Sequence, residues 1–180
     1  MKLLFTISVA ALACGIGHTQ TAALFSDASS GPVSFAATEI RNAQSTKGGS
    51  LIELGLDGLA ADRTPRRFVI AVGPSQSQRL SSQLGIAPLK SDSPESYGIR
   101  RSTQDGRSTF VVLGADAAGA MYGGLDLGEA IRLGTLDSIA DSDHSPRVER
   151  RGIKFNVPLD VRTPSYSDNS DAAQSNIGEM

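Results

Sequence analysis

The sequence predicts an α/β (α+β) domain with a mixed, mostly antiparallel sheet and helices packed on one face. Three observations lead to this class. Segments with strand periodicity alternate along the chain with segments of helical periodicity. Asp105-Gly106 separates two apolar segments, which indicates an antiparallel hairpin because both residues tolerate the positive φ angles of a tight turn. The segment 66–73 is apolar on both faces, as in a central strand.

The first half of the chain is expected to supply two strands and a helix before that central strand. We expect a first strand over residues 32–37 and a helix over 36–47, with Ile40 and Ala43 at helical spacing. Gly48-Gly49 would end the helix. A second strand is expected over 51–56.

A short amphipathic helix and the hairpin follow the central strand. The pattern over residues 75–84 predicts the helix, and Gly85 and Pro88 are its stop signals. The hairpin strands are expected over 96–102 and 107–115.

A long helix is expected over residues 117–133, with Asp116 as its N-cap and Gly134 as its stop. Its glycines would let it lie close on a sheet. We expect a packing face and an opposite outward face, formed respectively by Ala117, Met121, Leu125, Gly128 and Ile131, and by Asp126, Glu129 and Arg132.

The start of this helix superficially matches a dinucleotide-binding turn, because a strand leads into Gly114 and Gly119 at a helix N-terminus. Asp116 stands where the middle glycine of that motif belongs and would put bulk and negative charge beside a phosphate. The preceding strand is also the far arm of a hairpin. We therefore predict no cofactor site and interpret Asp116 as a helix cap.

The amino-acid composition limits the classes of function that the chain can have. The chain has 180 residues, 39% of them hydrophobic and 20% charged, which suits one globular domain with a core. Its formal net charge is −2, so it lacks the positive surface that nucleic acid or an anionic membrane requires. Three arginine pairs are expected to be solvated strand ends: Arg66-Arg67, Arg100-Arg101 and Arg150-Arg151.

Residues 1–22 are typical of a secretory signal peptide. Lys2 gives a positive start, and the apolar stretch 3–17 is too short to span a bilayer comfortably. Cleavage is expected between Gln20 and Ala23, which predicts a secreted or periplasmic protein that leaves the membrane after cleavage.

The single cysteine, Cys14, lies within this leader. A lipoprotein reading would make Cys14 the lipid-bearing first residue, but Ala11 stands three positions before it, where a bulky leucine is usual. Soluble export is the favoured interpretation. The mature domain would then have no cysteine, which excludes disulfides, thiol chemistry and Cys-ligated metals.

The residues show no catalytic constellation. The two histidines are His18, in the leader, and His144, in a predicted solvated linker, so a Ser-His-Asp triad is unsupported. No histidines or glutamates stand at metal-ligand spacing on a helix. Carboxylates are frequent in loops, but no pair is singled out for hydrolysis. We predict no catalytic, metal or cofactor residues in this chain.

Two segments resemble parts of known enzymes. "GADAAGAMYGGLDLGEAI" (114–131) resembles the G-x-x-Y-G-x-x-x-L helix that closes the small N-terminal α/β domain of family 20 β-hexosaminidases and α-glucuronidase-like glycoside hydrolases. "SPRVERRGIKFNVPLD" (145–160) is similar to the junction that follows this domain, where a Pro-led linker runs into an Arg-Gly-hydrophobic strand. In those enzymes that strand is the first of the catalytic (β/α)8 barrel.

The resemblance implies an N-terminal accessory domain over residues 30–144. Residues 145–180 would be a linker and the truncated first barrel strand, 153–157. The implied partners are the catalytic barrel of the same parent polypeptide and, through it, a carbohydrate substrate. The family's catalytic Asp-Glu pair lies on a later barrel strand, so this chain would be an inactive fragment of a secreted hydrolase.

Arg151 matches the arginine that binds sugar hydroxyls in the hexosaminidase pattern, and a linker arginine is the alternative. Lys154 and Asn156 depart from the pattern, where an apolar residue and an aspartate are usual.

A stand-alone carbohydrate-binding or structural exported domain is the alternative function for the whole chain. Such a binding module usually stacks sugars on exposed aromatic rings. This chain has no tryptophan, and its tyrosines are Tyr97, Tyr122 and Tyr166.

Overall fold

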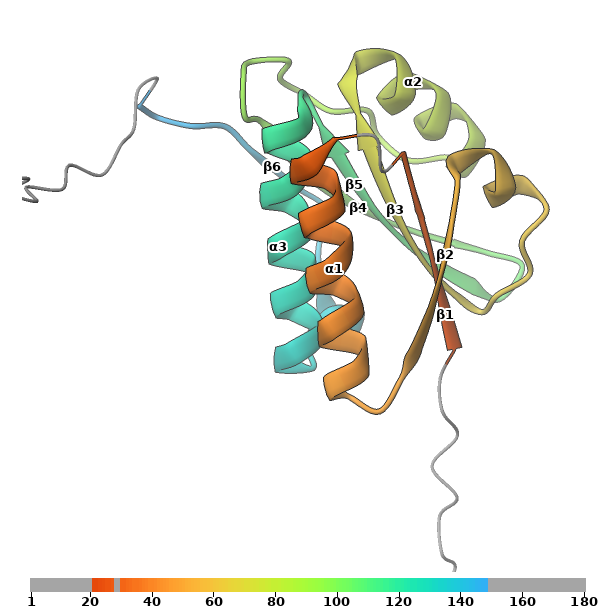
Figure 1. Cartoon of the computed structure of the whole chain (residues 1–180). Helices are drawn as coiled ribbons and strands as arrows, with labels where there is room; N and C mark the ends of the chain where they lie inside the picture. The colour runs from red at the N-terminus through yellow and green to blue at the C-terminus, as the bar shows by residue number, and fades with distance from the viewer. Residues whose placement is uncertain (1–20, 28–29, 149–180) are drawn as a thin grey trace, which may run out of the picture. The chain divides into compact units, whose positions relative to one another are not determined.

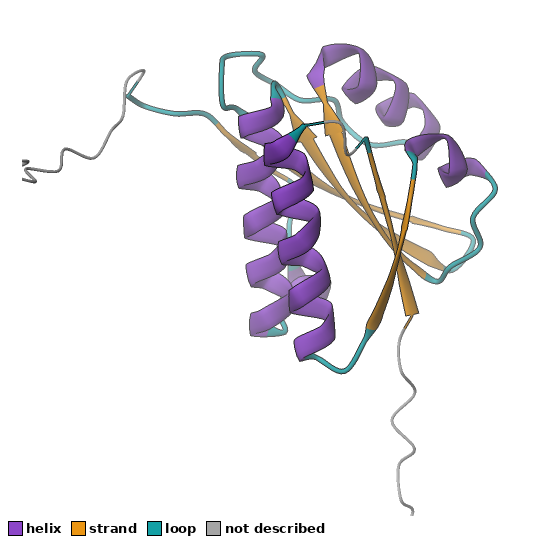
Figure 2. Cartoon of the chain, viewed as in Figure 1, coloured by secondary structure: helices purple, strands orange, loops and turns teal. Residues whose placement is uncertain are grey.

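The computed structural model describes residues 21–27 and 30–148 and contains, within them, a six-stranded sheet flanked by three α-helices (Figures 1 and 2). The strands are β1 (Thr21–Ser26), β2 (Ser50–Leu54), β3 (Arg66–Val72), β4 (Tyr97–Gln104), β5 (Arg107–Gly114) and β6 (Ser142–His144). The helices are α1 (Gly31–Thr46), α2 (Gly73–Leu84) and α3 (Ala117–Leu133), with short 3-10 turns η1 (Leu56–Ala60) and η2 (Leu136–Ser138).

The strand order is β2-β1-β3-β5-β4-β6. The pairs β1–β2, β1–β3 and β3–β5 are parallel, whereas β4–β5 and β4–β6 are antiparallel. The α/β class and the mixed sheet are confirmed, and β3 is internal as predicted. The proportion of parallel and antiparallel strand pairs differs from the prediction, because the sheet is not mostly antiparallel. Strand β1, which was not expected, takes part in two of the three parallel pairs.

The predicted strand over residues 32–37 is wrong, because this segment belongs to α1. Ser30 caps the helix by accepting a hydrogen bond at Oγ from the Val33 N–H at 3.4 Å, and a proline lies in the first turn, where its missing N–H does no harm. The first strand is β1, whose residues Ala22–Phe25 are all fully buried. The domain expected to begin near residue 30 therefore includes Thr21–Ser26.

Helices cover both faces of the sheet, and not one face as predicted (Figure 1). Helices α1 and α3 lie side by side on one face, over a core that includes Leu24, Phe68 and Phe110. On the other face, α2 and η1 cover a second core that includes Phe25 and Val111. Side chains of β1, β3 and β5 alternate between the two cores, which is why residues 68–71 of β3 are apolar.

Glycines bring α3 close to its neighbours, as predicted. A Cβ atom on Gly119 would lie 2.2 Å from the Ser96 carbonyl oxygen, and one on Gly123 would lie 2.6 Å from Cγ1 of Val112. On Gly124 it would lie 2.6 Å from Cβ of Ala36 on α1.

The packing face of α3 is therefore rotated from the predicted one, because glycines make the contact rather than larger apolar residues. Gly128 and Ile131 are buried as expected, but Ala117, Met121 and Leu125 are only partly buried, whereas Ala120 and Leu127 are fully buried. The outward face of Asp126, Glu129 and Arg132 is confirmed.

The predicted turns and caps are present. Asp105 and Gly106 have φ angles of 51° and 72°, as the hairpin turn requires. Gly85 and Gly134 end α2 and α3 in the left-handed conformation. Asp116 caps α3 by accepting at Oδ1 from the Gly119 N–H at 2.7 Å, and its Oδ2 accepts from the Glu95 N–H at 3.0 Å.

Strand β6 was not predicted and pairs with β4 at the sheet edge. It includes His144, which was expected in a solvated linker. None of the helices formed by residues 21–27 and 30–148 has the length and apolar character needed to cross a membrane.

Candidate functional site

Arg100 on β4 ties the last strand to the rest of the domain. Its side chain is only 1% exposed, although we expected a solvated strand end. Nε and Nη2 donate to the Ala87 and Pro88 carbonyl oxygens, each at 2.9 Å. On β6, Nη1 donates to the Ser142 carbonyl oxygen, and Nη2 donates to Asp143 Oδ1 at 2.6 Å. One guanidinium therefore joins the α2–β4 loop to β6, and we call it, with Asp143, the Arg100 clasp.

The electrostatics of Asp143 follow from this contact. Burial raises the pKa of the Asp143 carboxyl, but hydrogen bonds from Arg100 and from the backbone and side chain of Lys90 lower it by more, so the pKa lies below its ordinary value. A carboxyl with a lowered folded-state pKa stabilises the fold above its unfolded-state pKa, and this stabilisation is lost as pH falls through the folded-state pKa.

We therefore predict that Asp143→Asn destabilises the domain most near neutral pH. The difference in the free energy of unfolding between wild type and variant should shrink as the pH falls from about 7 towards about 3. Urea denaturation across this range measures it. A difference that stays constant down to the lowest pH would show that the ionised form of Asp143 contributes no stability.

A second contact links β6 with β4 and α3. The Tyr97 ring stacks on the His144 ring, with centroids 4.7 Å apart and planes inclined by 13°. The Tyr97 hydroxyl donates to the Asp126 carboxylate on α3. Burial and, secondly, this hydrogen bond raise the pKa of Tyr97 above its ordinary value, so its hydroxyl stays protonated and acts as a donor.

Arg67 on β3 is also buried, at 4% exposure, against our expectation of a solvated strand end. Its Nε and Nη2 donate to the Thr109 hydroxyl on β5, at 2.9 and 2.6 Å. Burial and, secondly, the charge of Arg107 lower the pKa of Arg67 below its ordinary value. The contact crosses two paired strands, so its role is to join them.

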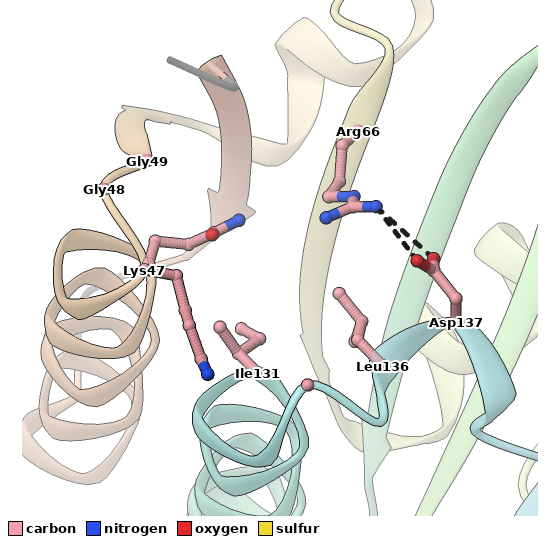
Figure 3. A pocket seen from close by; sticks show the side chains of 9 residues that line it. Lys47, Gly48, Gly49, Arg66, Ile131, Leu136 and Asp137 are labelled. Carbon is pink, nitrogen blue, oxygen red and sulfur yellow. Dashed lines mark hydrogen bonds and ion pairs between the residues drawn. The ribbon is translucent and has the colours of Figure 1, made fainter. Parts of the chain in front are cut away.

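One concave site is a pocket of about 280 Å³ at the amino ends of β2 and β3 (Figure 3). In Figure 3, Lys47 and Arg66 approach it from opposite sides, and Ile131 and Leu136 lie between them. Arg66 Nη2 donates to both carboxylate oxygens of Asp137, at the long distances of 3.3 and 3.4 Å. The remaining lining residues are Gln44, Gly48, Gly49 and Gly134.

Gln44 is the unusual member of this lining. It is 4% exposed, and its Nε2 is buried without a hydrogen-bond partner among the described residues. Buried polar groups in native proteins nearly always have a partner, and exceptions ask for an explanation such as a bound molecule. The pocket thus combines a spare buried donor, two cationic side chains and one carboxylate.

Several residues singled out from the sequence lie outside the described residues: Cys14, His18, Arg151, and the predicted barrel strand 153–157. The sugar contact expected of Arg151 therefore stays a prediction. Within residues 21–27 and 30–148, no three His, Cys, Asp or Glu side chains gather where they could hold a metal ion.

Sequence reasoning missed Gln44, Arg100 and Asp143. A signal existed for Gln44, because it stands four residues after Ile40, on the apolar side of a predicted helix. The sequence contained no signal for the burial of Arg100, because an arginine beside a second arginine in a strand suggests an exposed edge. The carbonyl oxygens that accept from Arg100 belong to residues distant in the sequence.

No model of a known protein family matches the chain, and no curated protein matches its sequence. Several solved structures are similar to part of it, and two of them are as follows. A GH138 enzyme targeting pectin rhamnogalacturonan II is 17% identical, with a TM-score of 0.49 over 72% of this chain and 16% of that chain. CpGH84D is 15% identical, with a TM-score of 0.43 over 62% of this chain and 18% of that chain.

This chain therefore spans less than a fifth of the length of either structure. At TM-scores below 0.5, these likenesses assign neither a fold nor an activity to it.

Proposed function

We propose that this chain is the non-catalytic N-terminal accessory domain of a secreted glycoside hydrolase, of the type found in family 20 β-hexosaminidases or α-glucuronidase-like enzymes. The observation that carries the proposal is the packing of the G-x-x-Y-G-x-x-x-L motif. A Cβ atom on Gly119 would clash with Ser96, directly before β4, and one on Gly123 would clash with β4 and β5. Leu127 is fully buried. Three of the four residues that carry the resemblance thus have a defined packing role in this fold.

The proposed role of the domain is to anchor the start of the catalytic barrel. Strand β6 ends at His144, directly before the segment 145–160 that resembles the linker and first barrel strand. The Arg100 clasp and the Tyr97–His144 stack fix β6 to the sheet. An isolated parallel strand cannot pair or bury itself, so residues 153–157 need the rest of a barrel beside them. In this proposal Arg151 contacts the sugar hydroxyls.

An activity assay tests the proposal. The purified 180-residue chain should not hydrolyse a panel of aryl glycosides. The resemblance implies that the acid/base pair of such an enzyme lies on a later barrel strand. A mock purification from cells that do not produce the chain serves as the matched blank for contaminating activity. Turnover by the wild-type chain above this blank would overturn the proposal. Tight binding of a polysaccharide by the chain alone, in an affinity screen, would instead favour the stand-alone binding domain.

Export is part of the proposal, and the pairing of β1 supports a cleavage site at or before Thr21. Cleavage after Ala22 would remove two β1 residues that pair with Ser50, Leu51 and Arg66 on either side. We therefore expect the exported protein to begin at or before Thr21. Amino-terminal sequencing or intact-mass analysis of the secreted protein measures this. A mature chain that begins at Ala23 or later would contradict the place of β1 in the folded domain.

A further inference from the structure

The pocket at the amino ends of β2 and β3 has hydrogen-bonding capacity that the fold does not use. Its deepest polar group is the Gln44 amide, whose Nε2 donor is buried and unpartnered among the described residues. Lys47 and Arg66 add two cations, and the Lys47 ammonium group forms no hydrogen bond or ion pair with residues 21–27 and 30–148. The pocket lies at the opposite end of the parallel strands from the edge where α/β sheets usually bind ligands.

Several backbone acceptors near the pocket are already occupied. Helices α1 and α3 both end there, and helix C-termini normally present free carbonyl oxygens. Here the α1 carbonyls of residues 43–45 accept from the N–H groups of Lys47, Gly48 and Gly49. The α3 carbonyls of Ala130 and Ile131 accept from Thr135 and Gly134. The pocket thus has more donor groups, on Gln44, Lys47 and Arg66, than free acceptors, which suits an anionic ligand.

The charges agree with that surplus. The lining includes two cationic side chains and one carboxylate, Asp137, which is 69% exposed and accepts from Arg66 only at 3.3 and 3.4 Å. Such a long, exposed ion pair is weak, so Arg66 can turn to a second carboxylate without losing a strong contact. An arginine also binds a carboxylate with two parallel hydrogen bonds more readily than a lysine does.

The apolar part of the lining limits what the rest of the ligand can be. Ile131 and Leu136 are buried and lie between the two cations (Figure 3). At about 280 Å³, the pocket is smaller than most sites for drug-sized ligands and suits a single small ring. A sugar ring has an apolar C–H face that can cover these two side chains.

We propose that this pocket binds a small carboxylate carried on a sugar ring, a sugar acid. The carboxylate lies between Lys47 and Arg66 and accepts from Gln44 Nε2, and the C–H face of the ring covers Ile131 and Leu136. The choice of a sugar acid over another carboxylate rests on the proposed function. The excess of donors in the pocket is an observation of the structure and does not depend on the proposed function.

The side-chain amide of Gln44 reports on the proposal directly. In 1H–15N spectra of the 15N-labelled chain, titration with D-glucuronate should shift the Gln44 NH2 signals saturably. D-glucose, which has a similar ring without the carboxylate, should bind at least about tenfold more weakly, because it lacks the charge-assisted hydrogen bonds. Inorganic phosphate and acetate are the further probes.

Matched variants separate the pocket from general attraction of anions. Lys47→Gln should weaken glucuronate binding about tenfold. Arg79→Gln, the same loss of one positive charge on the exposed surface of α2, should leave it unchanged. Gln44→Leu should weaken binding as well, and the exposed Lys47→Gln keeps the test decisive if Gln44→Leu does not fold.

Each other outcome overturns the inference. No shift of the Gln44 signals with any probe would mean that water satisfies the amide. Equal shifts with glucose would show that the carboxylate does not contribute to binding. Equal binding of phosphate would indicate an adventitious ion only, and equal binding of acetate would remove the sugar ring. The Gln44 signal reports binding to this pocket and does not depend on hydrolysis. The inference can therefore fail while the proposed function stands, and the proposed function can fail while the inference stands.

Discussion

Replacing Arg100 with methionine is expected to lower the free energy of unfolding by about 3–5 kcal/mol, the range for removing one partner of a buried ion pair. Methionine fills a similar volume but removes the buried cation from Asp143, whose side chain is 18% exposed, and leaves it only the exposed ammonium group of Lys90. It also leaves the Ala87, Pro88 and Ser142 carbonyl oxygens without the donor they share. Urea denaturation followed by circular dichroism measures the loss.

The neighbouring arginine provides the matched control. Arg101 points to the other face of β4, is exposed, and lies 5.6 Å from the centroid of the Phe110 ring. Arg101→Met should therefore lower the free energy of unfolding by less than about 1 kcal/mol. Equal effects of the two substitutions would show that the Arg100 clasp contributes no special stability.

The same variant tests what the clasp holds. In Arg100→Met, hydrogen exchange should accelerate first at the β6 amides that bond β4, since β6 has only three residues and one strand neighbour. The double variant Arg100→Met, Asp143→Asn should be more stable than Arg100→Met alone, because it no longer holds the Asp143 carboxylate without its buried cation. A double variant that is less stable would mean that the remaining ion pair with Lys90 outweighs that cost.

Gly119→Ala is expected to destabilise the domain by about 3 kcal/mol, the upper end for overpacking a well-packed contact. The new methyl carbon would lie 2.2 Å from the Ser96 carbonyl oxygen. That oxygen cannot move freely, since it accepts from the Ala115 N–H at 2.8 Å. Helix α3 would have to lift from the start of β4, and thermal and urea unfolding would both record the change.

The same helix contains its own control. At Gly128 an added Cβ atom would meet nothing closer than the Glu39 carbonyl oxygen at 3.6 Å, an ordinary contact. Gly128→Ala should therefore stabilise the domain by about 0.5–1 kcal/mol through helix propensity. If both alanines stabilised the protein equally, the close approach of α3 through Gly119 would be refuted.

Local signals predicted much of the fold correctly. The Asp105-Gly106 turn, the Asp116 cap and the stops at Gly85 and Gly134 depend on the conformational preferences of single residues, so they can be read from short stretches. The close packing of α3 followed from its glycines in the same way.

The errors arose where distant partners decide the structure. The segment of β1 is short, apolar and rich in small residues, which suits an export signal as well as a buried strand. Strand β6 is wholly polar and exists through its pairing with β4 and the Arg100 clasp. The burial of Arg67 and Arg100 likewise depends on acceptors more than ten residues away.

The candidate site was least accessible from sequence. Gln44, Arg66 and Asp137 are far apart in the chain and meet only because α1, β3 and η2 converge at one end of the sheet. Sequence patterns could place Gln44 on the inner side of a helix, but could not show that its amide lacks a partner there.

The central proposal is that this chain is the accessory domain that precedes a catalytic barrel, and the DNA immediately downstream of the Met180 codon tests it most directly. The account predicts that this DNA encodes the rest of a (β/α)8 barrel, with alternating strands and helices and an Asp-Glu pair on a later strand. Downstream sequence that encodes no such pattern would contradict it.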